Sequence, residues 1–442
     1  MPKLLLINPV SANQVKGSRY FGAYQMAPLG LAYLAALTPD HWEIKIIDEY
    51  WDDFKYEPAD LVGITSFTPT INRAYEIAAV FREKKKVPVI MGGIHVSMVP
   101  DEALQHVDTI VLGEAESIWP QVIADCEKGN LRPQYEGEPA DMAALPFPRR
   151  DLLSPKYKIA TVLTSRGCPM NCDFCSVTTF NKGTFRQRPP EHVLAELETI
   201  PQNGIIFCDD NIAGYGPRAR ENALELFRGM RARGLGKWWG SQVSLQVAED
   251  DELLSAAAES GCRGLYFGIE SVDEDVLKTM RKGVNLKSGV KNYPKLFANI
   301  HKHGILVVGA MIYGSDQDKP SVFANMSDFI LNSGMDVAVV SALTPLPGTT
   351  FYKKIRDGGR LLYTNYPKDW KLYDNKHYLF RSENFTEEEI YRGERLIKRK
   401  IYSVAGLLKR FFRTMTVTKS IVLALVCLGA NWSYRKDLNK KN

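Results

Sequence analysis

The chain has 442 residues, of which 45% are hydrophobic and 24% are charged, as in an ordinary globular protein. These proportions exclude a globally disordered, collagen-like or coiled-coil chain, and the length predicts about two to four domains. The formal net charge of +5 is unevenly distributed, because residues 392–442 carry +11 and residues 1–391 carry −6. The body is therefore mildly acidic, and the basic C-terminal segment needs a separate explanation.

The N-terminus and the cysteines predict a cytoplasmic protein. The apolar run Leu4–Ile7 is stopped by Asn8 and Pro9, so it is far shorter than the core of a signal peptide. Three of the seven cysteines lie within eight residues, a spacing that suits metal ligation better than a disulfide framework. The longest apolar stretch, Ile421–Ala430, has ten residues, whereas a spanning helix needs about 20, so no membrane span is expected.

Residues 1–138 predict a doubly wound α/β domain. Five apolar runs alternate with helical segments: Leu4–Ile7, Glu43–Asp48, Leu61–Thr65, Val87–Met91 and Thr109–Leu112. This alternation is typical of a parallel sheet that is covered on both faces by helices. Such sheets bind ligands in the loops at the carboxyl ends of their strands. Glycines in those loops, at Gly92, Gly93 and Gly113, either allow a ligand to approach the backbone or simply form turns.

A proline-containing linker, residues 139–157, is predicted to lead into a second α/β domain at residues 158–350. Six further apolar runs are each followed by a helical segment: Ile159–Leu163, Gly204–Cys208, Gln242–Val247, Gly264–Ile269, Ile305–Tyr313 and Val337–Leu343. This pattern predicts a partial (βα)6 barrel, in which the chemistry lies at the carboxyl ends of the strands. Residues 351–442 remain as a helical C-terminal extension.

Cys168, Cys172 and Cys175 follow the first barrel strand directly. Their CxxxCxxC spacing lets three thiolates bind one compact metal centre from a single loop, whereas a closed zinc site needs a fourth ligand. Cys208 lies within a strand run, where a small buried hydrophobic residue is expected. The three cysteines therefore indicate an iron–sulfur cluster with one iron open to a ligand, and an incomplete zinc site is the alternative.

This segment resembles the radical S-adenosylmethionine (SAM) enzymes, whose defining pattern CxxxCxΦC has its aromatic position at Phe174 here. The resemblance implies that the three cysteines hold a [4Fe–4S] cluster, that its open iron binds the amino and carboxylate groups of SAM, and that Phe174 contacts SAM. It also implies an external electron donor of the ferredoxin or flavodoxin type and a 5′-deoxyadenosyl radical. The part of the protein in such chemistry is to position and seclude the cofactor.

Polar residues at the end of the second barrel strand are predicted to contact SAM. Asp209, Asp210 and Asn211 follow the apolar run and resemble the FxDDN segment that contacts the SAM amino group in this family. A helix cap formed by Asp210 or Asn211 is the alternative.

The third and fourth barrel strands supply further SAM candidates. Gln242, Ser244 and Gln246 alternate with apolar residues, so we expect them on the interior of the barrel, with a solvated edge strand as the alternative. Glu270 belongs to a Gly-Ile-Glu-Ser segment that recurs next to SAM in the family, although Ser271 would also suit a helix cap. From this group Ser244 and Glu270 are predicted to bind SAM.

A doubly wound domain ahead of such a barrel resembles the cobalamin-binding radical SAM subclass. The broader cobalamin fold has a DxHxxG loop, an SxL segment and a GG pair, and the last two correspond here to residues 66–68 and 92–93. The loop Asn8–Gly17 contains no histidine, which implies cobalamin binding without a histidine from this loop. A domain kept only for packing is the alternative. The cobalamin contacts implied by the resemblance are Ser66, Phe67, Gly92, Gly93, His95, Gly113 and Glu114, and a purely structural role is the alternative for His95.

The basic C-terminal segment predicts one amphipathic helix from Glu394 to Arg413, followed by the apolar run Ile421–Trp432. A basic amphipathic helix with such a run resembles an interfacial membrane anchor, which would place the protein at the membrane periphery. Nucleic acid is not expected as a partner, because it would explain the charge but not the apolar run. A helix packed on the barrel is the alternative.

Together these features predict a cobalamin-dependent radical SAM enzyme that methylates an unactivated carbon of a lipophilic substrate, such as an isoprenoid lipid or a tetrapyrrole. One SAM would supply the methyl group through cobalamin, and a second would supply the radical. A radical SAM cyclase or oxidoreductase of the same architecture is the second hypothesis. A non-catalytic, metal-bound scaffold that interacts with membranes is the third. No catalytic side chain is assigned.

Overall fold

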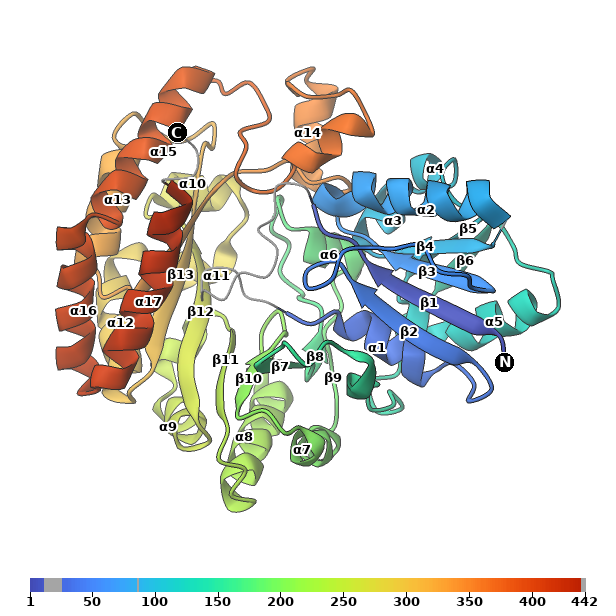
Figure 1. Cartoon of the computed structure of the whole chain (residues 1–442). Coiled ribbons are helices and arrows are strands. Elements are labelled where there is room, and N and C mark those ends of the chain that lie inside the picture. The colour runs from blue at the N-terminus through green and yellow to red at the C-terminus, as the bar shows by residue number, and fades with distance from the viewer. Residues whose placement is uncertain (12–25, 86, 439–442) are drawn as a thin grey trace.

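A computed structural model describes residues 1–11, 26–85 and 87–438 of the chain. Two six-stranded parallel sheets form the framework, and helices cover their faces. In Figure 1 the first sheet lies on the right in blue, the second lies in the centre in green to orange, and the C-terminal helices stand in red beside the second sheet. This arrangement confirms the predicted fold class, a doubly wound domain followed by a partial barrel and a helical C-terminal region.

The first sheet has the strand order β2-β1-β3-β4-β5-β6, and all its neighbours pair in parallel. Its strands are β1 (Lys3–Asn8), β2 (Glu43–Asp48), β3 (Leu61–Thr65), β4 (Val89–Gly92), β5 (Thr109–Gly113) and β6 (Gln134–Gly137). Five of these were predicted. The sixth, β6, contains one buried apolar side chain, Tyr135, so its sequence carries no apolar run.

Helices cover both faces of this sheet, as a doubly wound fold requires. They are α1 (Leu29–Ala36), α2 (Ile71–Lys85), α3 (Ile94–Met98), α4 (Pro100–Ala103) and α5 (Trp119–Glu127). Side chains of β1 alternate between two cores, because successive residues of a strand point to opposite faces. Leu5 and Ile7 pack in the core that contains α2, whereas Leu4 and Leu6 pack in the core that contains α1 and α5.

The second sheet has the order β14-β13-β12-β11-β10-β7, and again every pair of neighbours is parallel. The strands are β7 (Ile159–Val162), β10 (Gly204–Phe207), β11 (Trp238–Gln242), β12 (Cys262–Glu270), β13 (Leu306–Tyr313) and β14 (Val337–Ala342). A short antiparallel pair, β8 (Ser165–Arg166) and β9 (Arg186–Gln187), brackets the cysteine loop. The helices of this domain are α6 (Ser176–Phe180), α7 (Pro190–Thr199), α8 (Pro217–Ala232), α9 (Asp251–Glu259), α10 (Glu274–Thr279), α11 (Gly283–Ser288), α12 (Tyr293–Lys302) and α13 (Val322–Asn332).

The third barrel strand lies earlier than predicted, and the prediction of a strand over 242–247 was wrong. The strand β11 ends at Gln242, and the chain then forms a 3₁₀ helix over Leu245–Glu249. The side-chain Oδ1 of Asn211 accepts a hydrogen bond from the Ser244 backbone N–H at 3.3 Å, which draws the chain away from the sheet. The alternating apolar residues that suggested a strand are buried in this turn instead.

The C-terminal extension returns to the first domain before it forms the terminal helices. After α14 (Thr350–Asp357), a 3₁₀ helix over Lys368–Leu372 packs Trp370 into the core that contains α2. The indole Nε1 of Trp370 donates to Glu102 Oε2 at 2.9 Å. A few residues later, Tyr378 and Phe380 are buried in the barrel core. The extension therefore joins the two domains, a role that its sequence did not reveal.

The predicted single helix over 394–413 is two helices, α15 (Glu387–Ile401) and α16 (Val404–Thr418), and a third, α17 (Ile421–Leu438), follows. Ser403 separates the first two, because its side chain caps α16 by accepting from the Gly406 N–H. The apolar positions consequently do not share one face: Ile397 and Ile401 are buried, whereas Leu408 is 44% exposed. The three helices pack on the barrel beside α12, α13 and β14. Across the described ranges, no helix is both long and apolar enough to cross a membrane.

Candidate active site

Cys168, Cys172 and Cys175 line one cavity of about 320 Å³ at the carboxyl ends of the barrel strands. Among the described residues, no three His, Cys, Asp or Glu side chains converge closely enough to hold a single metal ion. Three cysteines at one cavity fit an iron–sulfur cluster, in which each cysteine binds a different iron. Burial raises the pKa of the Cys172 thiol to about 11, so binding of iron there displaces a proton.

The loop that carries the cysteines is fixed at its start by the two aspartates after β10. The Oδ1 of Asp209 accepts from the Thr164 N–H at 2.9 Å, and also from the Ser165 N–H and hydroxyl. The Oδ2 of Asp210 accepts from the Gly167 N–H at 3.0 Å. Gly167 has a φ of +88°, and a Cβ there would collide with the Thr184 carbonyl oxygen, so the turn into the cysteine motif requires glycine.

The predicted SAM contacts at the end of β10 therefore have different surroundings. Asp210 lines the cysteine cavity, whereas Asp209 and Asn211 are fully buried behind it. Burial raises the pKa of Asp209 to about 7. Asn211 holds the neighbouring loops, since it accepts from the Ser244 N–H and donates to the Gly214 carbonyl. Of the three residues, Asp210 therefore lines the cavity, whereas Asp209 and Asn211 hold the neighbouring loops in place through hydrogen bonds.

Glu270 lies at the end of β12 and lines the cysteine cavity, as predicted for a residue near SAM. Its backbone has a φ of +60°, which is unfavourable for a residue with a side chain and is often found at functional sites. Its Oε1 pairs with the Nζ of Lys282 at 2.7 Å. A Cβ at Gly268 would clash with the Glu270 Oε1 and would lie 2.8 Å from the Lys282 Nζ, so a side chain at that position would displace this pair.

Lys282 was not predicted as a site residue. Burial disfavours its charge, but Glu270 and the cysteine sulfurs outweigh that effect and hold its pKa above the ordinary value. Its Nζ also lies 5.9 Å from the centre of the Phe174 ring, which lines the same cavity. No local pattern pointed to Lys282, because its partner lies twelve residues earlier on another element.

Ser244 lines the same cavity, although it lies after β11 rather than within it. Gln242 also lines the cavity, whereas Gln246 does not. Among the predicted residues, the structure thus gathers three thiols, one aromatic ring, two carboxylates and a hydroxyl around a single space. The predicted residues that meet there are Cys168, Phe174, Cys172, Cys175, Asp210, Ser244 and Glu270.

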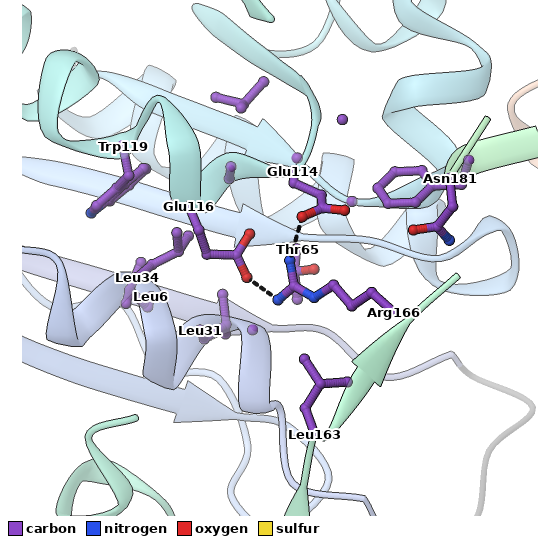
Figure 2. Close-up of a pocket in the computed structure, with 18 of the residues that line it drawn as sticks. Leu6, Leu31, Leu34, Thr65, Glu114, Glu116, Trp119, Leu163, Arg166 and Asn181 are labelled. Atoms are coloured by element: carbon purple, nitrogen blue, oxygen red, sulfur yellow. Dashed lines mark hydrogen bonds and ion pairs between the residues drawn. The ribbon is translucent and has the colours of Figure 1, made fainter. Parts of the chain in front are cut away.

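A second cavity, of about 300 Å³, lies where the first sheet meets the barrel (Figure 2). Its lining combines apolar and polar side chains. Six glycines line it, and a Cβ at Gly30 would meet no atom within 4 Å. A cavity of this size would hold part of a cobalamin molecule, such as the flat base of its nucleotide tail, and its glycines leave room beside the backbone. The apolar side chains that line it include Leu6, Leu31, Leu34, Ile90, Val111 and Trp119, and the polar ones include Thr65, Glu114, Glu116, Arg166 and Asn181.

Charged side chains in the lining of this second cavity join the two domains. The Nη1 of Arg166 donates to Glu114 Oε2 at 2.8 Å, and its Nη2 pairs with Glu116, as the dashed lines in Figure 2 show. Arg186 also pairs with Glu114. Burial acts to raise the pKa of Glu114, but the two arginines outweigh burial and lower it. Because Arg166 lies two residues before Cys168, the first domain anchors the strand that enters the cysteine loop.

The cobalamin residues predicted from the sequence separate into two groups. Gly92, Gly93, Gly113 and Glu114 line the second cavity, whereas Ser66, Phe67 and His95 do not. All seven histidines of the chain lie in the described ranges, and none of them lines this cavity. That cobalamin binds without a histidine from the loop Asn8–Gly17 stays a prediction, and residues 12–17 of this loop lie outside the described residues.

His95 has a structural environment. It is fully buried, its Nδ1 lies 3.2 Å from the Thr68 hydroxyl, and its Nε2 lies 3.7 Å from Glu102. The Trp370 ring packs edge-on against it at 5.1 Å. Burial lowers the pKa of His95, so the ring is neutral at physiological pH. Phe67, in contrast, is 58% exposed beside this region.

The B12 binding domain family matches residues 22–123, and the radical SAM superfamily matches residues 162–329. Bacteriochlorophyllide d C-12(1)-methyltransferase of Chlorobaculum tepidum is 31% identical over 451 residues, which cover 94% of this chain and 94% of that protein. Hopanoid C-2 methylase of Rhodopseudomonas palustris is 27% identical over 401 residues, or 86% of this chain and 74% of that protein.

A solved structure shares the whole architecture. The radical SAM methyltransferase TsrM of Kitasatospora setae, determined with tryptophan substrate and a SAM analogue, superimposes with a TM-score of 0.72. The match covers 100% of both chains at 17% sequence identity. At this identity the likeness shows the fold, and the relatives above show the family.

Proposed function

Because the chain belongs to the cobalamin-binding radical SAM enzymes, we propose that it methylates an unactivated carbon of a lipophilic tetrapyrrole. Its cofactors are a [4Fe–4S] cluster, SAM and cobalamin. When bound, the cluster and SAM supply a carbon-centred radical, and cobalamin supplies the methyl group. The observation that carries the proposal is the adjacency of the two cavities, since Asp210 lines both of them.

The residues of the chain have separate tasks in this proposal. The three cysteines hold the cluster on one wall of the first cavity, and Glu270 and Ser244 offer polar contacts to SAM beside it. The Arg166 guanidinium, paired with carboxylates of the first domain, keeps the cysteine loop at a fixed position relative to the second cavity. These contacts support methyl transfer because the radical and the methyl donor must meet one substrate within a closed space.

The lining of the first cavity supports a lipophilic substrate. Apolar side chains from several strand ends face this space and leave few charges for a polar substrate to pair with. They include Val243, Leu245, Ile312, Leu343 and Leu346. The names of the relatives, a bacteriochlorophyllide methyltransferase and a hopanoid methylase, favour a tetrapyrrole or an isoprenoid lipid over a peptide or a sugar. We favour the tetrapyrrole because the bacteriochlorophyllide methyltransferase is more similar to this chain than the hopanoid methylase is.

Anaerobic turnover tests the proposal. The reconstituted holoenzyme is supplied with SAM, a low-potential reductant and bacteriochlorophyllide d. We expect S-adenosylhomocysteine and 5′-deoxyadenosine in comparable amounts, together with a product heavier by one methylene group. Formation of 5′-deoxyadenosine without S-adenosylhomocysteine would favour a cyclase or an oxidoreductase instead.

Cys172→Ala serves as the matched control for this assay. It removes one thiol of the cluster and leaves the second cavity untouched. We expect the variant to lose the visible absorption of the cluster and all SAM cleavage, while it retains cobalamin. Equal activity in the variant would refute the cluster assignment, and absence of SAM cleavage in the intact holoenzyme would favour a non-catalytic scaffold.

We further propose that this cytoplasmic enzyme touches the membrane through the outward faces of α16 and α17. Leu408, Phe412 and Leu425 are 44%, 54% and 55% exposed, and Trp432 is 43% exposed. In vesicle cosedimentation we expect the wild type to bind and Phe412→Ser to bind more weakly. Equal binding of the two proteins would contradict the proposal. As a further partner we propose an external electron donor of the ferredoxin or flavodoxin type.

A further inference from the structure

Tyr215 lies against one of the three cluster cysteines. Its Oη is 2.9 Å from the Sγ of Cys168, and its ring lines the cysteine cavity. A cysteine that binds iron is a thiolate, which has no proton to donate. In the loaded enzyme the hydrogen bond therefore runs from the phenol to the sulfur, because the phenol is the partner that retains a hydrogen.

The loop around Tyr215 holds the phenol in this position. Gly214 and Gly216 flank it with φ values of +66° and +85°, which turn the backbone sharply on both sides. The Nδ2 of Asn211 donates to the Gly214 carbonyl at 2.8 Å and ties the turn to the end of β10. The ring of Phe185 packs edge-on against the tyrosine, with 5.3 Å between the ring centres. The turn and the Phe185 ring thus hold the hydroxyl beside Cys168.

The other two cysteines have a different environment. Lys282 lies near Cys172 and Cys175, where its charge favours the thiolates, but this charge is compensated by its pairing with Glu270. Cys168 instead receives a neutral donor. A hydrogen bond to a cluster sulfur stabilises the reduced state more than the oxidised one, because the added electron increases the negative charge on the sulfur.

We propose that Tyr215 is a positioning residue that donates a hydrogen bond to the Cys168 thiolate and thereby eases reduction of the cluster. The proposal concerns electron entry and does not depend on methyl transfer. If no methylated product forms in the substrate assay, the proposal for Tyr215 can therefore still be tested by spectroscopy.

Redox titration of the anaerobically reconstituted holoenzyme, followed by electron paramagnetic resonance, tests the proposal. In Tyr215→Phe the ring and its packing remain and only the donor is removed. At the potential where half of the wild-type cluster is reduced, we expect the ratio of reduced to oxidised cluster in the variant to fall at least about threefold. A full complement of cluster iron that titrates at the wild-type potential would overturn the proposal.

Tyr293→Phe is the matched control. Its hydroxyl is buried and makes no hydrogen bond to a cysteine, so its removal should leave the potential unchanged. An equal shift in both variants would show a general packing effect and would overturn the assignment to Tyr215. If Tyr215→Phe fails to bind the cluster, 3-fluorotyrosine at position 215 gives a second test. This more acidic phenol should raise the reduced fraction, and no change would refute the hydrogen bond.

Discussion

Asp209→Asn tests whether a buried carboxyl behind the cysteine loop keeps its proton in the folded protein. Asp209 is 1% exposed, and its Oδ2 has no hydrogen-bond partner among the described residues. Burial raises its pKa from 3.8 to about 7, although Oδ1 accepts bonds from Ser165 and Thr164 that act in the opposite direction. Asparagine keeps an oxygen for these donors and carries no charge, so it reproduces the protonated state at every pH.

The sign of the pH effect follows from the direction of the pKa shift. Between the unfolded pKa of 3.8 and the folded pKa of about 7, the folded state keeps a proton that the unfolded state releases, so wild-type stability falls as the pH rises. From pH 5 to pH 8 the loss is about 3 kcal/mol, at roughly 1.4 kcal/mol for each pKa unit. The amide side chain of the variant does not titrate, so the variant does not lose this stability. A loss of about 3 kcal/mol corresponds to a fall of roughly 6–12 °C in the Tm of a domain of this size.

Thermal unfolding followed by circular dichroism at pH 5 and pH 8 measures this difference in proteins with the same cofactor content. We expect the Tm advantage of Asp209→Asn over the wild type to grow from pH 5 to pH 8. Asp40→Asn, at an exposed carboxyl, should show the same difference from wild type at both values. If the advantage of the Asp209 variant is identical at the two pH values, the carboxyl is ionised in the folded state and the reasoning is refuted.

Three further substitutions, the first with a control variant, test the packing of the domains. Ile397→Ala, at a fully buried position of α15, should lower the unfolding free energy by about 2–5 kcal/mol. The control Leu408→Ala, at an exposed position of α16, should change it by less than about 0.5 kcal/mol. Equal effects of the two variants in denaturant titrations would contradict the assigned helix faces. Arg166→Met removes the arginine paired with the largely buried carboxylate of Glu116 and leaves Glu114 with Arg186 alone, so we expect a loss of about 3–5 kcal/mol and faster proteolysis between the domains. Trp370→Phe removes the hydrogen bond to Glu102 and should lower the unfolding free energy by about 1–3 kcal/mol, and an unchanged denaturant midpoint would refute its bridging role.

The parts of the fold that were predicted correctly depend on local patterns. The run Leu4–Ile7 lies within β1 and the run Thr109–Leu112 within β5, because a strand buried on both faces is apolar along its whole length. The CxxxCxxC spacing is equally local. In contrast, β6 has one apolar residue that faces the core, Tyr135, and its pairing with β5 decides that it is a strand. The partner strand β5 lies about 25 residues earlier in the chain, so the local sequence around β6 does not reveal the pairing.

The same distinction explains the residues missed in the site. Arg166 pairs with carboxylates about 50 positions earlier, and Tyr215 reaches a cysteine 47 positions away. Such contacts follow from the arrangement of the strands rather than from spacing along the chain. The third barrel strand was misplaced for a related reason: Val243, Leu245 and Val247 alternate as in a strand, but a side chain from β10's end turns the backbone into a 3₁₀ helix.

The charge of the C-terminal segment shows how burial changes the meaning of a sequence count. Arg410 is fully buried and donates to Asn431 Oδ1 and to the Ile401 carbonyl, both at 2.6 Å. Arg413 donates to backbone carbonyls of the barrel, and Lys400 pairs with Asp328. Three of the thirteen basic side chains of this segment, Lys400, Arg410 and Arg413, are therefore used in contacts within the protein. Contact with a membrane would then depend on the exposed apolar side chains of α16 and α17, so we expect vesicle binding to respond weakly to anionic lipid and to salt.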